Sequence, residues 1–444
     1  MSISTSRLKR YFRSGHVSMT PAVTWSALYG AQSLLLSRRA TISPSVIPGV
    51  ESVAVYPEHD KLSEEFRALD TFNGSAAIAA MVSELSLGAE DSVLLPAYCC
   101  GAELGPFRHA GCQIHFYDIK LDLSVDKEQI ERCVAEHPSI RLLFVTHYFG
   151  VSQPQVSSLT KWCGDKGILL VEDCAHALYS LVDGKPVGSE GDYAIFSQRK
   201  SLPLTEGGKL VSRAPLKAST IDASDGKVPL LPRFERLCYS LQQGARCREQ
   251  GSSAQLSASA LCKSAGAVAT IAIASIPSIL IKLFKAAGRT RAVDWLTPDV
   301  EGEDAVPIYT VGSSALSRRV LSASDVNAVV TTRRDNYARW LMRMENISQA
   351  QPLIEFLPEG CCPLYFPVIV SEPSACVDAL AQADIEAYNW WQHTPVELSG
   401  LEPTAFPVAL KLKRSVVALP VHQFVTIEQI DRMSDVLSRA VSLK

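Results

Sequence analysis

The chain of 444 residues lacks the features that mark several common functional classes. Its twelve cysteines form no C-x-x-C pair, so we expect reduced thiols and no metal site. With a net charge of −3, it has neither a basic excess nor the arginine–aromatic pattern of nucleic-acid-binding proteins. It also lacks the short apolar core and small-residue cleavage site of a secretory signal, which indicates a cytoplasmic protein.

Acidic residues are absent from residues 1–50, which carry six Lys and Arg. We therefore predict that residues 1–57 form a basic N-terminal arm. The arm is either solvated or in peripheral contact with an acidic partner or an anionic surface, such as the inner face of a membrane.

Residues 265–281, within the apolar segment 265–283, contain no charged residue of either sign. A buried or interfacial hairpin, contact with a membrane surface and a true membrane span are the three interpretations of that segment.

Between residues 58 and 212, short apolar runs alternate regularly with helical stretches. Alternation at this spacing is typical of βαβ units, so we predict a large α/β domain with a mostly parallel, buried sheet. The predicted strands are 92–96, 113–118, 141–147, 168–173, 193–197 and 209–212.

The second half of the chain follows a different pattern. Residues 213–310 are rich in Ser, Ala, Pro and Arg, and we predict an insertion of helices and loops there. Residues 311–444 are predicted to form a smaller C-terminal α+β domain. Its predicted elements are a long helix over 323–347, strands over 364–370 and 416–420, and helices over 374–384 and 426–441.

Candidate chemistry lies at the predicted carboxyl ends of the strands, where α/β proteins bind ligands. Asp173 ends one strand and is followed by His176, and Lys200 follows another strand. Gly74 precedes an apolar helix, where free N–H groups and the helix dipole favour an anion. Each feature alone has an ordinary explanation, because a strand-end carboxylate is usually a cap and a loop lysine is usually solvated. Together, in this order, they indicate a single site.

Five motifs carry a resemblance to a known family. They are NGSAA (73–77), VLLPAYCC (93–100), VEDCAHAL (171–178), GDYAIFSQRKSLPLTEGGKLV (191–211) and LPVHQFVTIEQIDRM (419–433). Over residues 58–212 and again in the last hundred residues, the chain resembles the DegT/DnrJ/EryC1/StrS family of sugar aminotransferases. The resemblance implies fold type I of the pyridoxal 5'-phosphate (PLP)-dependent transferases, which is the aspartate aminotransferase-like fold, and a homodimer.

The resemblance also implies roles for individual residues. Lys200 would form a Schiff base with the cofactor aldehyde, Asp173 would pair with the pyridine nitrogen, and His176 would hydrogen-bond the phenolic oxygen. General chemistry agrees with the first two roles, because a desolvated lysine is a better nucleophile and a nearby carboxylate keeps the ring nitrogen protonated. Tyr98 would stack on the ring. The residues implied for the phosphate are Gly74, Ser75, Ala76 and Ser197.

The match departs from the family pattern around Lys200. The spacing from Ser197 to Lys200 is shorter than is usual in the family, so we expect a tighter loop and leave the phosphate contact of Ser197 open. Four residues are candidate substrate contacts, since aromatic faces suit sugars and arginine suits phosphate. Each also has a structural interpretation: a capped strand end, a solvated helix start or aromatic packing between domains. They are His147, Arg318, Trp390 and His393.

The implied activity is transfer of an amino group, from Glu or Gln, to a keto-sugar that is free or nucleotide-linked. Polysaccharide or secondary-metabolite biosynthesis is the implied setting. Two alternatives stay open. One is different PLP chemistry on the same fold, namely a lyase, decarboxylase or condensing enzyme. The other is a non-catalytic, membrane-associated member of the family.

Overall fold

The computed structural model describes residues 66–204, 206–216, 309, 312–322, 324–399 and 404–442. The predicted arm 1–57 and nearly all of the predicted insertion 213–310, with its apolar segment 265–283, lie outside these residues. Within the described ranges, no helix combines the length and the apolar character needed to cross a bilayer.

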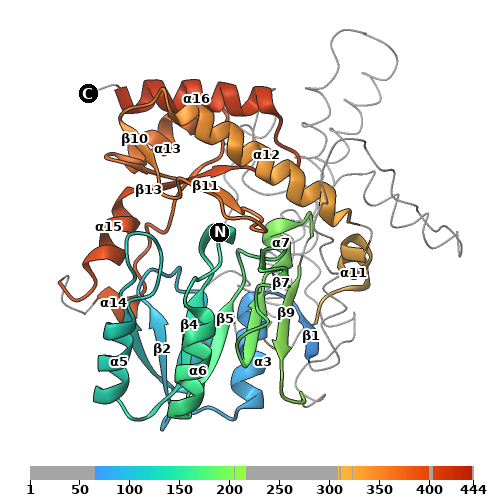
Figure 1. The fold of residues 1–444 in the computed structure, drawn as a ribbon, viewed down its shortest axis with the longest axis vertical. Coiled ribbons are helices and arrows are strands. Elements are labelled where there is room, and N and C mark those ends of the chain that lie inside the picture. The colour runs from blue at the N-terminus through green and yellow to red at the C-terminus, as the bar shows by residue number, and fades with distance from the viewer. Residues whose placement is uncertain are drawn as a thin grey trace, which may run out of the picture.

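A seven-stranded sheet forms the centre of the larger domain (Figure 1). β9 runs antiparallel to both of its neighbours, and the other four strand pairs are parallel. In spatial order, the strands are β1 (Arg67–Thr71), β9 (Gly208–Ser212), β8 (Tyr193–Phe196), β5 (Leu169–Asp173), β4 (Ile140–Thr146), β2 (Ser92–Pro96) and β3 (Gln113–Tyr117). The six predicted strands are confirmed. β1 was not predicted, because its sequence RALDT is mostly polar and largely exposed.

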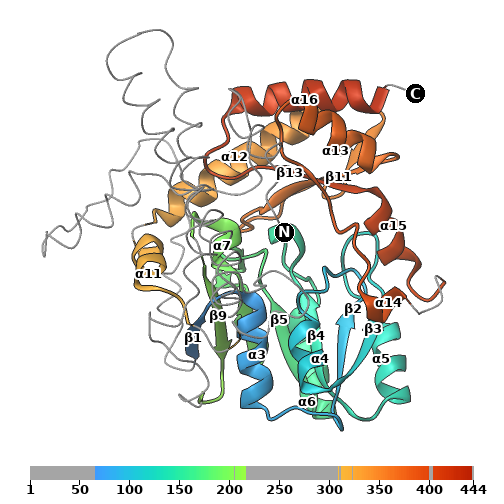
Figure 2. The same cartoon turned by 180° about the vertical axis from the view of Figure 1, so that it is seen from behind.

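Helices cover both faces of this sheet, which explains why its central strands are apolar throughout. All five residues of β2 are buried. α3 (Gly74–Glu84) and α4 (Gly105–Ala110) lie on one face (Figure 2), whereas α5 (Lys127–Glu136) and α6 (Val156–Lys166) lie on the other (Figure 1). This arrangement directs the carboxyl ends of the parallel strands toward the smaller domain.

The smaller domain is a four-stranded antiparallel sheet with helices packed on it (Figure 1). Its core is separate, with Trp340 stacked on Phe366 at 5.4 Å between ring centroids. Its elements are β10 (Ala350–Pro352), β11 (Tyr365–Val370), β13 (Val416–Pro420), β12 (Tyr388–Asn389), α12 (Val326–Met344), α13 (Pro373–Gln382), α14 (Val396–Ser399), α15 (Pro407–Ser415) and α16 (Ile427–Ser442).

The predicted helix over 323–347 is wrong at its start. A separate helix, α11 (Ala315–Ser322), precedes it, and α12 begins at Val326. Asp325 is the N-cap, because its carboxylate accepts the Ala328 N–H at 3.0 Å. The remaining short elements are η2 (Tyr148–Gly150), β6 (Leu181–Val182), β7 (Lys185–Pro186) and α7 (Gln198–Ser201).

Candidate active site

Asp173 is the last residue of β5, near the middle of the large sheet. Its Oδ1 accepts the Ala175 N–H at 3.0 Å, which turns the chain sharply after the strand. Burial raises the pKa of the Asp173 carboxyl, and the nearby Glu103 carboxylate adds to this effect, whereas the positive charge of Lys200 opposes it. The carboxyl is therefore a partly buried acid whose ionised form is favoured by a cation close by.

His176 lies three residues farther along and is only 3% exposed. Its Nδ1 accepts the Phe149 N–H at 3.4 Å, so the ring proton belongs on Nε2. Burial holds the pKa of His176 well below its usual range, and the Lys200 charge lowers it further. His176 is therefore a neutral imidazole whose Nε2–H can donate.

Lys200 lies on α7, a single helical turn that follows β8 after one residue, Ser197. The tighter loop that the spacing predicts is thus a short helix, in which the Lys200 N–H donates to the Ser197 carbonyl at 3.0 Å. Asp173 ends β5 and Lys200 follows β8, its parallel neighbour, so both residues lie at the same carboxyl edge of the sheet, where the Lys200 charge acts on Asp173 and His176. The sequence had placed all three at this edge.

α7 is held from the smaller domain by Arg333, which is 1% exposed. The guanidinium donates to the Ser201 carbonyl at 2.9 Å and to the Pro363 and Leu364 carbonyls at 3.0 and 3.2 Å. Gln423 also donates to the Ser201 carbonyl, at 3.2 Å. The residue after Lys200 is thus fixed by two side chains that the sequence did not single out.

The start of α3 adjoins α7 and forms a candidate anion site. A Cβ on Gly74 would lie 3.7 Å from the Cβ of Ser197, so these two predicted phosphate residues are neighbours. The first N–H groups of a helix have no partner within it. The Ala76 N–H, however, already donates to Asn73 Oδ1 at 2.9 Å, which argues against Ala76 as a phosphate ligand. Gly74 and Ser75 are the better candidates.

The glycine pair after Lys200 allows the chain to pass close to this site. A Cβ on Gly208 would lie 2.2 Å from the backbone of Asn73, so only glycine fits at the start of β9. The Gly-Gly pair therefore allows β9 to pack directly against the start of α3.

An aromatic wall lies beside the three polar residues. The Tyr98 hydroxyl donates to the Trp390 carbonyl at 2.6 Å, and its ring contacts Trp391 at 5.1 Å and Tyr148 at 5.4 Å between centroids. Trp391 and Trp390 each lie 5.5 Å from the His176 ring. Trp391 therefore bridges two residues implied to hold the cofactor ring, Tyr98 and His176. The candidate residues named from the sequence included Trp390 but not Tyr148.

Of the four candidate substrate residues, two lie near the aromatic wall and two have structural contacts instead. Trp390 joins the aromatic wall, and His393 is exposed nearby on the same segment. His147 is completely buried: its Nε2 bonds Glu172 at 2.9 Å and its Nδ1 accepts the Gln153 N–H at 3.0 Å. The structure therefore favours the structural interpretation of His147. Arg318 is exposed on α11, and its guanidinium bonds the Ser313 carbonyl, which favours a helix-start role.

Sequence reasoning missed a second acid at this edge. Cys100 donates through its Sγ to Glu103 at 2.9 Å, and burial together with the Glu103 charge raises the pKa of this thiol. The Lys200 charge reaches Cys100 as well, which places Glu103 close to the site. Its position in the loop after β2, at the carboxyl edge, was the available signal.

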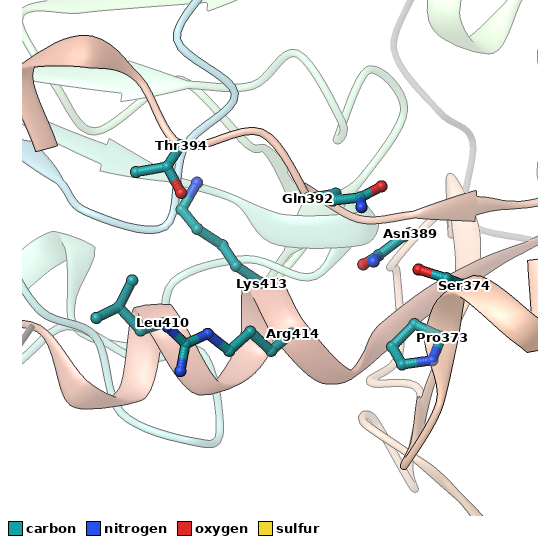
Figure 3. Close-up of a pocket in the computed structure, with 8 residues that line it drawn as sticks. All are labelled: Pro373, Ser374, Asn389, Gln392, Thr394, Leu410, Lys413 and Arg414. Carbon is teal, nitrogen blue, oxygen red and sulfur yellow. The ribbon is translucent and has the colours of Figure 1, made fainter. Parts of the chain in front are cut away.

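A cavity of about 260 Å³ lies in the smaller domain, beside the segment 389–394 (Figure 3). In Figure 3 the Lys413 side chain extends toward Thr394. Lys413 Nζ donates to the Cys99 carbonyl at 2.6 Å and the His393 carbonyl at 3.2 Å, which ties this cavity wall to the loop bearing Tyr98. The cavity contains none of the predicted catalytic residues and is therefore separate from their cluster. Its lining residues are Pro373, Ser374, Asn389, Gln392, Thr394, Leu410, Lys413 and Arg414.

Comparison with known sequences gives a partial but specific match. The sequence profile of the DegT/DnrJ/EryC1/StrS aminotransferase family matches residues 58–225. The chain is 29% identical over 147 residues to GDP-perosamine synthase of Vibrio cholerae, which covers 32% of this chain and 39% of the relative. It is 32% identical over 144 residues to a UDP-4-amino-4,6-dideoxy-N-acetyl-beta-L-altrosamine transaminase of Campylobacter jejuni, with 31% and 38% covered. The chain thus spans less than two fifths of these relatives' lengths.

Solved structures extend the likeness to nearly the whole chain. The aminotransferase TlmJ from Streptoalloteichus hindustanus matches with a TM-score of 0.61 at 16% identity, over 96% of this chain and 99% of that one. Helicobacter pylori PseC, an aminotransferase involved in the biosynthesis of pseudoaminic acid, matches with a TM-score of 0.61 at 14% identity, over 96% and 99%. These likenesses confirm the predicted fold, with a mostly parallel α/β domain and a smaller α+β domain.

Proposed function

Because residues 58–225 belong to the DegT/DnrJ/EryC1/StrS aminotransferase family, we propose that the protein is a PLP-dependent aminotransferase. It transfers an amino group, from glutamate or glutamine, to a keto-sugar in polysaccharide or secondary-metabolite biosynthesis. The names of the two curated relatives contain GDP- and UDP-linked compounds, which supports a nucleotide-linked substrate.

One observation carries the proposal. Asp173 and His176 follow β5 and Lys200 follows its neighbour β8, so the three residues share one edge of the sheet, where the charge of the lysine acts on both partners. An anion site at the start of α3 adjoins them through Ser197. An amine, a partly buried acid, a neutral imidazole donor and an anion site suit the aldehyde, the ring nitrogen, the phenolic oxygen and the phosphate of PLP.

The residues fit the cofactor on the evidence of their own contacts. No ion pair links Asp173 to any residue within the described ranges, so a protonated pyridine nitrogen would supply a charged partner for this partly buried carboxyl. The Nε2–H of His176 suits the phenolic oxygen. The phosphate would be held by the N–H groups of Gly74 and Ser75 and the hydroxyl of Ser197.

Each residue then has a defined task. When bound, PLP supplies an electron sink for the bonds at the substrate's reacting carbon. Asp173 would keep the proton on the ring nitrogen, and His176 would stay neutral and donate through Nε2. Lys200 Nζ would hold the cofactor and, as a free amine, would serve as the base that accepts and returns a proton at the substrate's reacting carbon. Trp391 and Tyr98 form an apolar wall that excludes water from this proton transfer.

The aromatic wall also supports a sugar substrate. Trp390 and Trp391 contact His176, Tyr148 packs against Trp391, and Trp391 is partly exposed; aromatic faces pack well on the apolar faces of sugars.

A half-reaction screen tests this function. The protein is loaded with pyridoxamine phosphate and offered a panel of free and nucleotide-linked keto-sugars, while the visible absorption of lysine-bound PLP is followed. We expect the band to return with at least one keto-sugar, and to disappear when glutamate or glutamine is added to the PLP-loaded protein. A band that no amino donor removes, with decarboxylation or elimination of an added amino acid instead, would assign the protein to other PLP chemistry.

The proposal includes a cytoplasmic homodimer, because the fold commonly builds its sites at a subunit interface. Peripheral contact of residues 1–57 with an anionic membrane surface accompanies it as a hypothesis from their charge. Sedimentation analysis tests the dimer, and flotation with anionic vesicles, with and without residues 1–40, tests the membrane contact.

A further inference from the structure

Three metal-ligating side chains meet away from the candidate active site, between β3 and α5. His115 is the third residue of β3, and Cys133 and His137 lie one helical turn apart at the end of α5. One donor atom from each residue lies within 4.8 Å of the other two. The two imidazole rings are stacked, with 3.8 Å between centroids and an interplanar angle of 24°. The three side chains are partly buried.

This cluster leaves a polar atom unsatisfied. Nε2 of His115 is buried and has no hydrogen-bond partner among the described residues. Buried polar atoms without partners are rare in folded proteins, and a bound ion is one of the few explanations.

A second group of metal-ligating residues in the same domain is different. His147, Glu172 and Cys174 also lie within 4.8 Å of one another. There, however, both nitrogens of His147 have partners, and the Glu172 carboxylate accepts three backbone N–H groups besides bonding His147. That group is a closed hydrogen-bond network, whereas the group around His115 is not.

We propose that His115, Cys133 and His137 bind one transition-metal ion of the zinc type, which fastens α5 to the edge strand β3. Two imidazoles and one thiolate suit Zn²⁺, and a water completes the tetrahedron. Bonds of about 2.0–2.3 Å place the donors of such a site roughly 3.3–3.8 Å apart, so binding draws them together by about 1 Å and turns the stacked rings apart. The metal–sulfur bond replaces the S–H bond, and the proton leaves to solvent.

The position indicates a structural role. β3 is the last strand of the large sheet, and β2 and β4 separate it from β5, which carries Asp173. An edge strand gains ladder hydrogen bonds on one side only, so a bond to the covering helix secures it. The site therefore works independently of the proposed transamination.

Metal binding is tested on the full chain, prepared without a polyhistidine tag and stripped with a chelator. Zn²⁺ is titrated in competition with a chromophoric chelator, and Co²⁺ is used as a spectroscopic probe. We expect one equivalent with a dissociation constant below about 1 μM, and a sulfur-to-cobalt charge-transfer band. Cys133→Ser and His115→Gln should each weaken binding on the order of 100-fold or more, because even outer-shell losses cost tenfold to a hundredfold. The matched control Cys112→Ser, which removes the thiol next to β3, should bind as the wild type does.

Alkylation of the wild-type protein gives a second readout that needs no variant. Zn²⁺ should protect Cys133 from iodoacetamide, as seen by peptide mass spectrometry, and EDTA should remove the protection. The proposal is overturned if Zn²⁺ leaves Cys133 equally reactive, or if folded Cys133→Ser and His115→Gln proteins bind the metal as tightly as the wild type.

Discussion

Lys200 acts on two titratable neighbours, and both effects suit the cofactor. Its charge lowers the pKa of Asp173, which favours the carboxylate, and also lowers that of His176, which favours the neutral ring. These are the protonation states needed beside a pyridine nitrogen and a phenolic oxygen. At the scale of single residues, the site is therefore a set of coupled charges, and substitutions there should move pH profiles as well as rates.

His176→Gln tests the imidazole through pH. The pKa of His176 is lowered in the folded protein, so the unfolded chain binds the proton more readily, and stability is lost as pH falls below about 6.5. We expect the wild-type melting temperature to fall more between pH 7 and pH 5 than that of His176→Gln. Gln keeps a donor, so PLP binding should largely survive, whereas in His176→Ala it should weaken by about tenfold or more. Parallel pH profiles for wild type and His176→Gln would contradict the assignment.

Asp173→Asn should separate stability from function. Burial raises the pKa of this carboxyl, so the folded protein holds the proton more tightly than the unfolded chain does. The free energy of unfolding therefore falls as pH rises from the unfolded-state pKa through the folded-state pKa, and it stays lower at neutral pH. Asn removes that cost, and the PLP-free variant should gain on the order of 1 kcal/mol in free energy of unfolding. Its transaminase rate should fall at least about 100-fold, because the ring nitrogen loses its anionic partner. A less stable PLP-free variant in urea unfolding would show that Asp173 is a structural residue.

At the scale of elements, α7 is fixed by α12. Arg333 donates to three carbonyls, including that of Ser201, the residue after Lys200. Arg333→Met removes this donor from the Pro363 and Leu364 carbonyls and leaves the Ser201 carbonyl with Gln423 alone, so we expect a loss of about 3 kcal/mol in stability together with weaker PLP binding.

Arg334→Met is the matched control for this substitution. Arg334 donates to the Pro358 and Cys361 carbonyls and not to α7. Its loss should lower the melting temperature while PLP affinity stays unchanged. Equal PLP affinities in the two variants would refute a specific role of Arg333 in placing α7.

Elements were predictable from the sequence where a buried pattern was continuous, as in β2 and β4. β1 was missed because an edge strand with a polar sequence looks like a loop, and the helix start at Val326 was missed although Asp325 is a good cap. Two of the three residues of the proposed metal site, Cys133 and His137, form a C-x-x-x-H spacing on a predicted helical stretch, but the sequence was interpreted as having no metal site. His115 could not be added, because only the packing of α5 on β3 brings it there.

At the scale of the whole molecule, the two domains share the site. Trp390 and Trp391 come from the smaller domain, and their contacts with Tyr98 and His176 join segments nearly 300 and more than 200 residues apart in the chain. The motifs could predict Lys200 and Asp173, since both sit at strand ends. They could not predict Trp391 against Tyr98 or Arg333 against Ser201, because these contacts depend on how the domains pack.

A ligand held between two domains should stabilise the whole protein. PLP at 100 times its dissociation constant adds about 2.7 kcal/mol to the free energy of unfolding, which thermal unfolding with and without PLP would detect as a rise in melting temperature. We expect the rise in the wild type and a smaller rise in Ser197→Ala, in which one proposed phosphate ligand is lost. An unchanged melting temperature at saturating PLP would argue against binding at this site.

The central claim is that Lys200 binds the cofactor, and borohydride labelling tests it most directly. Lys413 is the rival amine, because burial lowers its pKa and its Nζ lies 6.0 Å from the centre of the Tyr98 ring. PLP-loaded protein should show a visible band that borohydride bleaches, with the reduced cofactor mapped to Lys200 by peptide mass spectrometry and absent from Lys200→Ala. A label on Lys413, or no band in PLP-supplied wild-type protein, would contradict the account.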